Sequence, residues 1–274
     1  MASDLKSWVK YIGTQSIPVF NETILSVLNL SMDDKSSSKQ LADTILQDAA
    51  LTSRVIRVAN SPYYSRRHAE LTNLRRIVLL IGFKKITEIC LTLSILDSIV
   101  DNKTRRHVYE IATKSYHAAI QARALAELYD ARDPDMVYMS TLLFNIGEIA
   151  FWSLTGKSGR LISDLLKYSG VKDEQAEKDI LGVTFRELSL GLAAEWRLSD
   201  MLKRALAQPT SNDINIKCIS YGNQIAEQII NENCDLNNIA EKIAHDNEYS
   251  TAQIKSMILE NMEIARDTYN YYKK

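Results

Sequence analysis

Three features of the sequence predict an all-α fold. Glycine and proline number only 9 and 4 among 274 residues, which is about 5% of the chain where about 12% is usual. Apolar residues recur at intervals of three and four, and no alternating run of β-branched residues is long enough for a strand. The hydrophobic share of 46% and the charged share of 24% are ordinary for a folded protein. We therefore expect long helices around a sizeable core.

Capping and turn residues divide the first hundred residues into helices. The first opens at Ser16–Pro18, because proline suits a first helical turn. Ser38 closes a polar loop and can cap the next helix. A third begins at Asp48 and ends before Pro62, since the residue preceding a proline avoids the helical conformation. The expected helices of this half cover about 16–30, 38–46, 48–59, 73–82 and 83–100.

The second half keeps the helical period, most clearly in the stripe formed by Ile111, Ser115, Ala119, Ala122, Leu125 and Tyr129. Pro209–Asp213 is a cluster of turn residues long enough to mark a boundary. We expect a helical domain at 12–208 and a C-terminal helical extension at 209–274. The extension should pack on the same body, because about 65 residues alone would bury little core. Further helices are expected at 105–129, 135–145, 147–154, 158–169, 173–181, 184–196, 199–208, 214–231, 236–245 and 250–272.

The charge balance and the cysteines limit the compartment and the partners. Lys and Arg number 33 against 34 Asp and Glu, so no global field attracts nucleic acid, which is an unfavoured partner. The apolar stretch Ile77–Ile99 is interrupted by Lys84, Lys85 and Glu88, so membrane insertion is not expected. Cys90, Cys218 and Cys234 form no disulfide or zinc pattern and should be reduced and buried. A cytoplasmic protein is expected.

Three segments carry a family resemblance. The first is Asp48–Tyr64 (DAALTSRVIRVANSPYY), the second is Ile77–Phe83 (IVLLIGF), and the third is Leu142–Glu148 (LLFNIGE), followed later by Leu181–Thr184 (LGVT). In this order and spacing they resemble the HDOD family, bacterial signalling domains related to the HD metal-dependent phosphohydrolases. The resemblance extends over roughly Ile12–Gln208. It implies an HD-like helical domain, a bacterial regulatory role and a protein partner in a signalling pathway.

The resemblance also shows where a metal would lie, and the residues there are poor ligands. HD enzymes use a His, a His-Asp dipeptide and a distant Asp, whereas this chain has Lys114 at the first position and Phe144 and Asn145 at the dipeptide. An ammonium repels a cation, a phenyl ring offers no donor atom, and an amide oxygen is a weaker ligand than a carboxylate. We expect a degenerate site with no metal and no cofactor.

Two histidines could be mistaken for metal ligands, one because it is near Lys114 and one because an aspartate follows it, and we reject both. His117 is one turn from Lys114 on what we expect to be a polar side with Thr113 and Gln121, and it has no second ligand at a suitable spacing. His245–Asp246 is a literal His-Asp pair, but it lies in the C-terminal extension and lacks the flanking apolar residues. Phosphate-binding glycine loops and nucleophile motifs are absent from the sequence.

The Asn60, Ser61, Pro62 and Tyr63 motif is expected to shape a corner of the chain, because short polar side chains satisfy backbone groups at helix ends and turns. The segment between residues 51 and 86 is also distinctive, because it carries eight basic residues and one acidic residue. Within it, Arg66, Arg67, Arg75 and Arg76 could bind an anion or a partner. We favour solvated helix faces and ion pairs with the acidic C-terminal helices instead.

These observations leave three functional hypotheses. The first is a non-catalytic bacterial signalling domain that binds a protein or a ligand such as a nucleotide messenger. The second is a metal-dependent phosphohydrolase or phosphodiesterase with a rearranged site. The third is a nucleotide- or nucleic-acid-binding module that uses the basic segment 51–86, whose affinity would fall steeply with salt. The replaced metal positions favour the first.

Overall fold

The computed structural model describes residues 4–13, 22–46, 49–61, 71, 73–97, 105–152, 154, 174–196, 198–230, 236–245 and 249–273. Regular structure in these ranges is helical throughout, which confirms the all-α prediction. Two of the predicted features, the helix at 158–169 and the helix start at Ser16–Pro18, lie outside the described residues. In the described part of the chain no helix is both long enough and apolar enough to cross a membrane.

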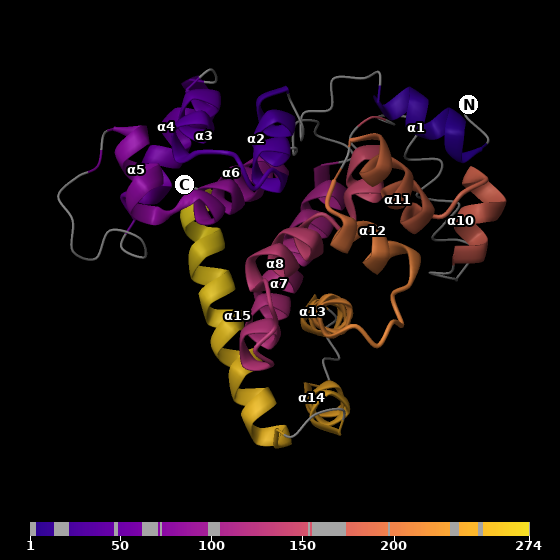
Figure 1. Cartoon of the computed structure of the whole chain (residues 1–274). Helices are drawn as coiled ribbons and strands as arrows, with labels where there is room; N and C mark the ends of the chain where they lie inside the picture. Colours follow the sequence, from indigo (N-terminus) through magenta and orange to yellow (C-terminus); the bar gives the residue numbers. More distant parts are fainter. Residues whose placement is uncertain are drawn as a thin grey trace.

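The N-terminal helices form a group on one side of the molecule, with the exception of α1, which lies on the other side (Figure 1). The group packs its apolar faces into one core with α7 and α8. The helices are α1 (Leu5–Gly13), α2 (Glu22–Met32), α3 (Ser38–Ile45), α4 (Ala49–Ala59), α5 (Leu74–Ile81) and α6 (Phe83–Asp97).

The sequence-based prediction missed α1 and misplaced one cap. Trp8 of α1 is buried and donates from Nε1 to the carbonyl oxygen of Leu181 at 3.1 Å, a tertiary contact that holds a short helix in place. The cap of α3 is Ser37, because its hydroxyl accepts from the Gln40 N–H and the Gln40 side chain accepts from the Ser37 N–H. This reciprocal pair is a capping box, which Ser38 cannot make from its position inside the helix.

The central and C-terminal helices complete the body. Along α7, the middle of the expected stripe is buried, from Ser115 to Leu125, whereas Ile111 and Tyr129 at its two ends are partly buried. The bounds are α7 (Arg105–Leu128), α8 (Pro134–Leu142), α10 (Glu174–Leu181), α11 (Phe185–Glu195), α12 (Asp200–Ala207), α13 (Ile214–Ile230), α14 (Leu236–His245) and α15 (Thr251–Lys273). Residues 146–152 are helical as well.

A second apolar cluster joins α7, α8 and α12 to α13, α14 and α15. Hydrogen bonds also tie α7 to the last part of the chain: Gln121 Nε2 donates to the Ile258 carbonyl at 3.0 Å, and the Tyr249 hydroxyl donates to the Leu128 carbonyl at 2.6 Å. The division of the chain at residues 209–213 stays a prediction. Cys90 and Cys218 are buried free thiols, as expected, and burial raises the pKa of Cys218 to about 12. Cys234 lies outside the described residues.

Asn60 has the structural role expected of its motif. Its Nδ2 donates to the carbonyls of Ile56 at 2.9 Å and Leu71 at 2.7 Å, and its Oδ1 accepts from the Leu71 N–H at 2.7 Å. One amide therefore holds together two points of the chain that are eleven residues apart. Ser61 is buried beside it, whereas Pro62 and Tyr63 lie outside the described residues.

Replacing Asn60 by alanine is expected to lower the free energy of unfolding by about 2 kcal/mol, because the buried N–H and C=O of Leu71 lose their partner. Urea denaturation of the two proteins measures the difference. Asn29→Ala is the matched control, since Asn29 is an exposed residue of α2 and its loss should leave the stability within about 0.5 kcal/mol. An equal effect of both substitutions would contradict the role given to Asn60.

Candidate functional site

The three positions that the resemblance assigns to metal ligands lie on α7 and on the turn after α8, and a hydrogen bond joins that turn to α7. Lys114 lies on α7, and Phe144 and Asn145 lie in the turn that follows α8. Asn145 Nδ2 donates to the buried hydroxyl of Ser115 at 3.0 Å, so the turn sits directly beside α7. The side chain of Phe144 is partly buried and packs against both apolar clusters. The structure places the turn with Phe144 and Asn145 beside Ser115, the α7 residue that follows Lys114, and the assignment of the three positions to metal ligands stays a prediction.

Gly147 fixes the course of the chain after this turn. Its N–H donates to the Ser189 hydroxyl at 3.0 Å, and that hydroxyl donates to the Phe185 carbonyl at 2.9 Å. A Cβ atom on Gly147 would lie 2.4 Å from the backbone nitrogen of Ser189. The turn carrying Phe144 and Asn145 is therefore anchored to α11 through a contact that only glycine permits.

Lys114 forms an ion pair with Glu227 of α13, a residue that the sequence analysis did not single out. The pair can form because α13 crosses α7 closely at Gly222. A Cβ on Gly222 would lie 2.5 Å from the Ala118 carbonyl oxygen and 2.7 Å from the Ala122 Cβ. With small residues at the crossing, α13 lies close enough to α7 for Glu227 to meet Lys114 one turn from Ala118. Both side chains of the pair are about one-third exposed.

The donor set at this place does not fit a divalent cation. The Lys114 ammonium already binds the nearby carboxylate, and the Asn145 amide donates to Ser115. No three His, Cys, Asp or Glu side chains in the described ranges lie close enough together to hold a metal ion. A hard cation needs several anionic oxygen donors to replace its water, and here the nearest carboxylate is neutralised by lysine.

His117 was expected on a polar side of its helix, and the structure instead buries most of that side. Its Nδ1 and the Thr113 Oγ1 one turn away are buried and have no hydrogen-bond partner among the described residues. Gln121, one turn further, is fully buried and bonds to α15. This face of α7 is thus covered, and burial lowers the pKa of His117. His245 ends α14, and Asp246 lies outside the described residues.

Acidification should therefore destabilise the protein through His117. Because its pKa is lower in the folded than in the unfolded chain, the unfolded chain binds more protons, and stability is lost as the pH falls below about 6.5. We expect denaturation midpoints measured between pH 7 and pH 5 to fall less in a His117→Gln variant than in the native protein. Parallel curves for the two proteins would show that His117 does not contribute.

The described basic residues of segment 51–86 mostly bind acids of the same chain. Arg75 pairs with Asp43 at 2.6 Å, Lys84 with Asp133 at 2.9 Å, and Lys85 with Glu88 at 3.1 Å. The partners belong to α3, α6 and the residue before α8, and not to the C-terminal helices that we expected. Arg76 is exposed on α5. Arg66 and Arg67 lie outside the described residues, so their role stays a prediction.

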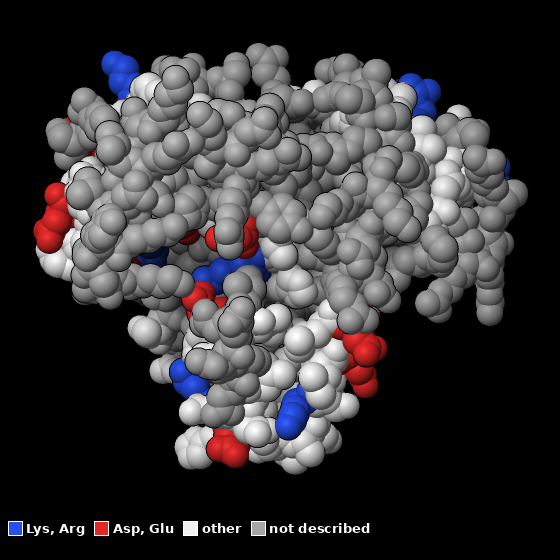
Figure 2. All heavy atoms as spheres, turned by 180° about the vertical axis from the view of Figure 1, so that it is seen from behind, with Lys and Arg blue, Asp and Glu red and all other residues white. Residues whose placement is uncertain are grey.

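The arrangement of charges agrees with pairing rather than with a basic surface. On the face opposite to that of Figure 1, the described Lys and Arg side chains lie singly at the margins or beside Asp and Glu, most clearly in a central hollow (Figure 2). Surface pairs of this kind contribute little stability, typically about 0–1 kcal/mol each. They do lower the local excess of positive charge that an anionic ligand would require.

The fold is that of an HD-like helical domain. The HDOD domain family matches residues 17–211. The chain belongs to the HDOD family. A search of curated proteins found no match.

Solved structures share the fold at low sequence identity. An HDOD domain protein of unknown function from Geobacter sulfurreducens is 22% identical, with a TM-score of 0.61 over 81% of this chain and 78% of the other. A "Putative phosphohydrolase" from Shewanella amazonensis SB2B is 17% identical, with a TM-score of 0.68 over 95% of this chain and 97% of the other. A "Putative signal transduction protein" from Marinobacter aquaeolei VT8 is 15% identical, with a TM-score of 0.66 over 100% of this chain and 62% of the other. At these identities the comparisons establish the fold, and function has to be argued from the site.

Proposed function

We propose that this protein is a non-catalytic signal-transduction domain of the bacterial cytoplasm, and that it acts by binding a protein partner. The observation that supports the proposal is the ion pair between Glu227 and Lys114, a position that the family resemblance assigns to a metal ligand. An ammonium bound to a carboxylate supplies the positive charge that a metal ion would otherwise bring, so the helices pack without one. Asn145, held by Ser115, completes a structural joint between α7, α8 and α13.

The same joint argues against hydrolysis of a phosphodiester. Metal-assisted hydrolysis needs a cation that polarises the phosphoryl oxygen and lowers the pKa of a bound water. The described residues around Lys114 offer no set of anionic ligands for such a cation. One neighbour in the fold is described as a phosphohydrolase and another as a signal-transduction protein, and the residues at the site favour the second role.

Turnover of a chromogenic phosphodiester, bis(p-nitrophenyl) phosphate, tests the absence of catalysis. The protein is purified without chelator, reloaded with Mn²⁺ or Mg²⁺, and assayed beside the same metal without protein. We expect equal rates, because the site supplies no activated water. A metal-dependent rate that rises with protein concentration and disappears in Asn145→Ala would contradict the proposal.

Binding of a partner is tested separately by affinity capture from cells that produce the protein. We expect one specific partner to be retained by the native protein after washing at about 0.15 M salt, where exposed charge pairs are already screened. Capture of no specific partner, combined with measurable phosphodiester turnover, would favour the phosphohydrolase hypothesis instead.

A further inference from the structure

A cavity distinct from the Lys114 site lies where the N-terminal helices meet the rest of the body. Its volume is about 460 Å³, which is within the range of about 300–1,000 Å³ typical of small-molecule sites. Residues of α2, α8, α11 and α12 surround it. The lining consists of Met32, Met136, Ala194, Leu198, Ser199, Asp200, Met201 and Lys203.

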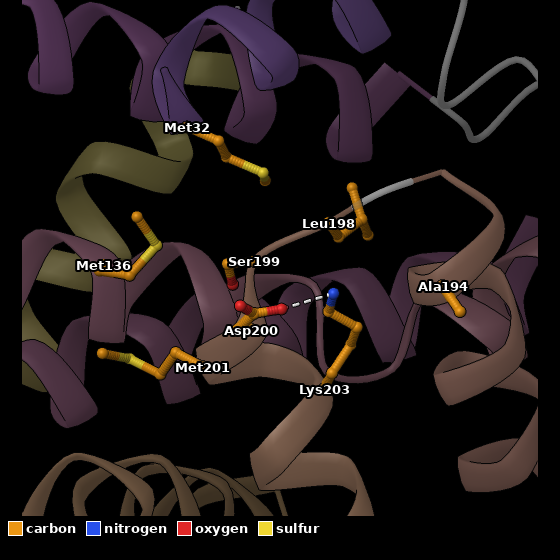
Figure 3. A pocket seen from close by; sticks show the side chains of 8 residues that line it. All are labelled: Met32, Met136, Ala194, Leu198, Ser199, Asp200, Met201 and Lys203. Carbon is orange, nitrogen blue, oxygen red and sulfur yellow. Dashed lines mark ion pairs between the residues drawn. The ribbon is translucent and has the colours of Figure 1, made fainter. Parts of the chain in front are cut away.

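Three methionines dominate the wall of this cavity. Figure 3 shows Met136 and Met201 on one side, Leu198 and Ala194 on the other, and Met32 between them. Each methionine is half-buried, and Met32 and Met136 border one apolar cluster while Met201 borders the other. Methionine side chains adapt to irregular shapes, and their sulfur atoms make favourable contacts with aromatic rings. The wall therefore suits a flat aromatic group.

The polar residues of the lining already have partners within the protein. The Lys203 ammonium lies 2.6 Å from the Asp200 carboxylate, the pair marked in Figure 3. The Ser199 hydroxyl accepts from the Leu202 N–H at 3.2 Å and lies 3.2 Å from the Ser140 hydroxyl. Among the described residues of the lining, the one cation and the one anion pair with each other, so neither is left to complement a charged ligand. The opening is marked by Ala194 and Asp200, which are exposed.

We propose that this cavity binds an uncharged aromatic small molecule, held between the three methionine side chains and Leu198. The aromatic ring would replace water against the thioethers, and no charged group would have to be desolvated without a partner. The inference does not depend on the function proposed above, since a catalytic domain of this fold could carry the same cavity. Its test therefore uses binding alone.

Two fluorescent probes that differ in charge provide this test. N-phenyl-1-naphthylamine is uncharged, and 1-anilinonaphthalene-8-sulfonate has the same ring system with one added sulfonate. Titration of the native protein should show saturable binding of the uncharged probe and an affinity for the sulfonate that is weaker by about tenfold or more. Equal affinities for the two probes would overturn the proposal that the cavity selects uncharged ligands.

Matched variants locate the binding. Ala194→Trp places a large side chain at the exposed edge of the cavity and should weaken binding of N-phenyl-1-naphthylamine by about tenfold or more. Ala252→Trp makes the same change at an exposed position of α15, outside the lining, and should leave binding unchanged. Met136→Gln keeps the length of the side chain but replaces its thioether by a polar amide, and it should weaken binding of the same probe several-fold. It replaces Ala194→Trp in the test if that variant does not fold. Unchanged binding in the folded cavity variants, or equal loss in Ala252→Trp, would overturn the proposed location.

Discussion

Replacing Arg123 by methionine is expected to lower the free energy of unfolding by about 3 kcal/mol, the largest effect that we predict for a charged residue. The Arg123 guanidinium lies 2.7 Å from the Glu88 carboxylate, and both side chains are largely buried, with 16% and 4% exposed. It also stacks on the Tyr138 ring at 4.1 Å. Without Arg123, the buried carboxylate keeps only Lys85 at 3.1 Å. Urea denaturation near pH 7 measures the loss.

A second substitution and a pH series distinguish a charge effect from lost packing. Burial raises the pKa of Glu88 against the lowering effect of Arg123 and Lys85. Arg123→Met removes the larger of the two lowering effects, so the pKa of Glu88 in the folded variant is higher than in the native protein. On acidification the folded variant therefore takes up a proton at Glu88 at a higher pH than the native protein does, and gains stability relative to it. The deficit of Arg123→Met should therefore shrink as the pH falls from 7 to 5. The double variant Glu88→Met with Arg123→Met should recover much of the loss. If the loss in free energy of unfolding were the same at both pH values and in the double variant, the unpaired charge of Glu88 would not be its cause.

Gly222→Val is expected to cost about 3 kcal/mol, because it forces apart the two helices that carry the Lys114–Glu227 pair. A Cβ at this position already meets the Ala118 carbonyl oxygen at 2.5 Å and the Ala122 Cβ at 2.7 Å. These atoms belong to the backbone of α7 or are fixed to it, so they move only if the helix moves. The midpoint of chemical denaturation, measured beside the native protein, gives the loss.

Gln228→Val is the matched control for the lower helix propensity of valine. It makes a β-branched residue at a half-exposed position of the same helix, and the propensity difference is only a few tenths of a kcal/mol. If both variants lost the same stability, the close crossing of α7 and α13 would not be the cause.

The elements were predictable because each carries its own local signal. The Asn73 cap, the Gly82 end and the apolar spacing of α5 all lie within ten residues, and the structure places α5 at Leu74–Ile81 as expected. The assignment of Lys114, Phe144 and Asn145 to metal positions comes from their spacing to family motifs and stays a prediction. The cap of α3 was misplaced for a local reason as well. Ser37 and Ser38 are adjacent, and the choice between them depends on the reciprocal hydrogen bonds that Ser37 makes with Gln40.

The partners in the site were not predictable, because they depend on how helices cross. Lys114 and Glu227 are 113 residues apart, and no local pattern links them. Gly222, in the middle of a helix and opposite two alanines of α7, was the available signal of a close crossing, but a single sequence does not show which helix it faces. The burial of His117 depends in the same way on α15, which covers Gln121 on the same face of α7.

The central claim is that a lysine–glutamate ion pair stands where the family's metal-dependent relatives hold a cation. Metal content tests it most directly, measured by elemental mass spectrometry on protein purified without chelator and again after loading with Mn²⁺ or Mg²⁺ and removal of the excess. The account predicts no stoichiometric metal in either sample, and the same result for a Glu227→Gln variant. One equivalent of bound metal in the native protein, lost in Asn145→Ala, would show that Lys114, Phe144 and Asn145 do not mark a lost site.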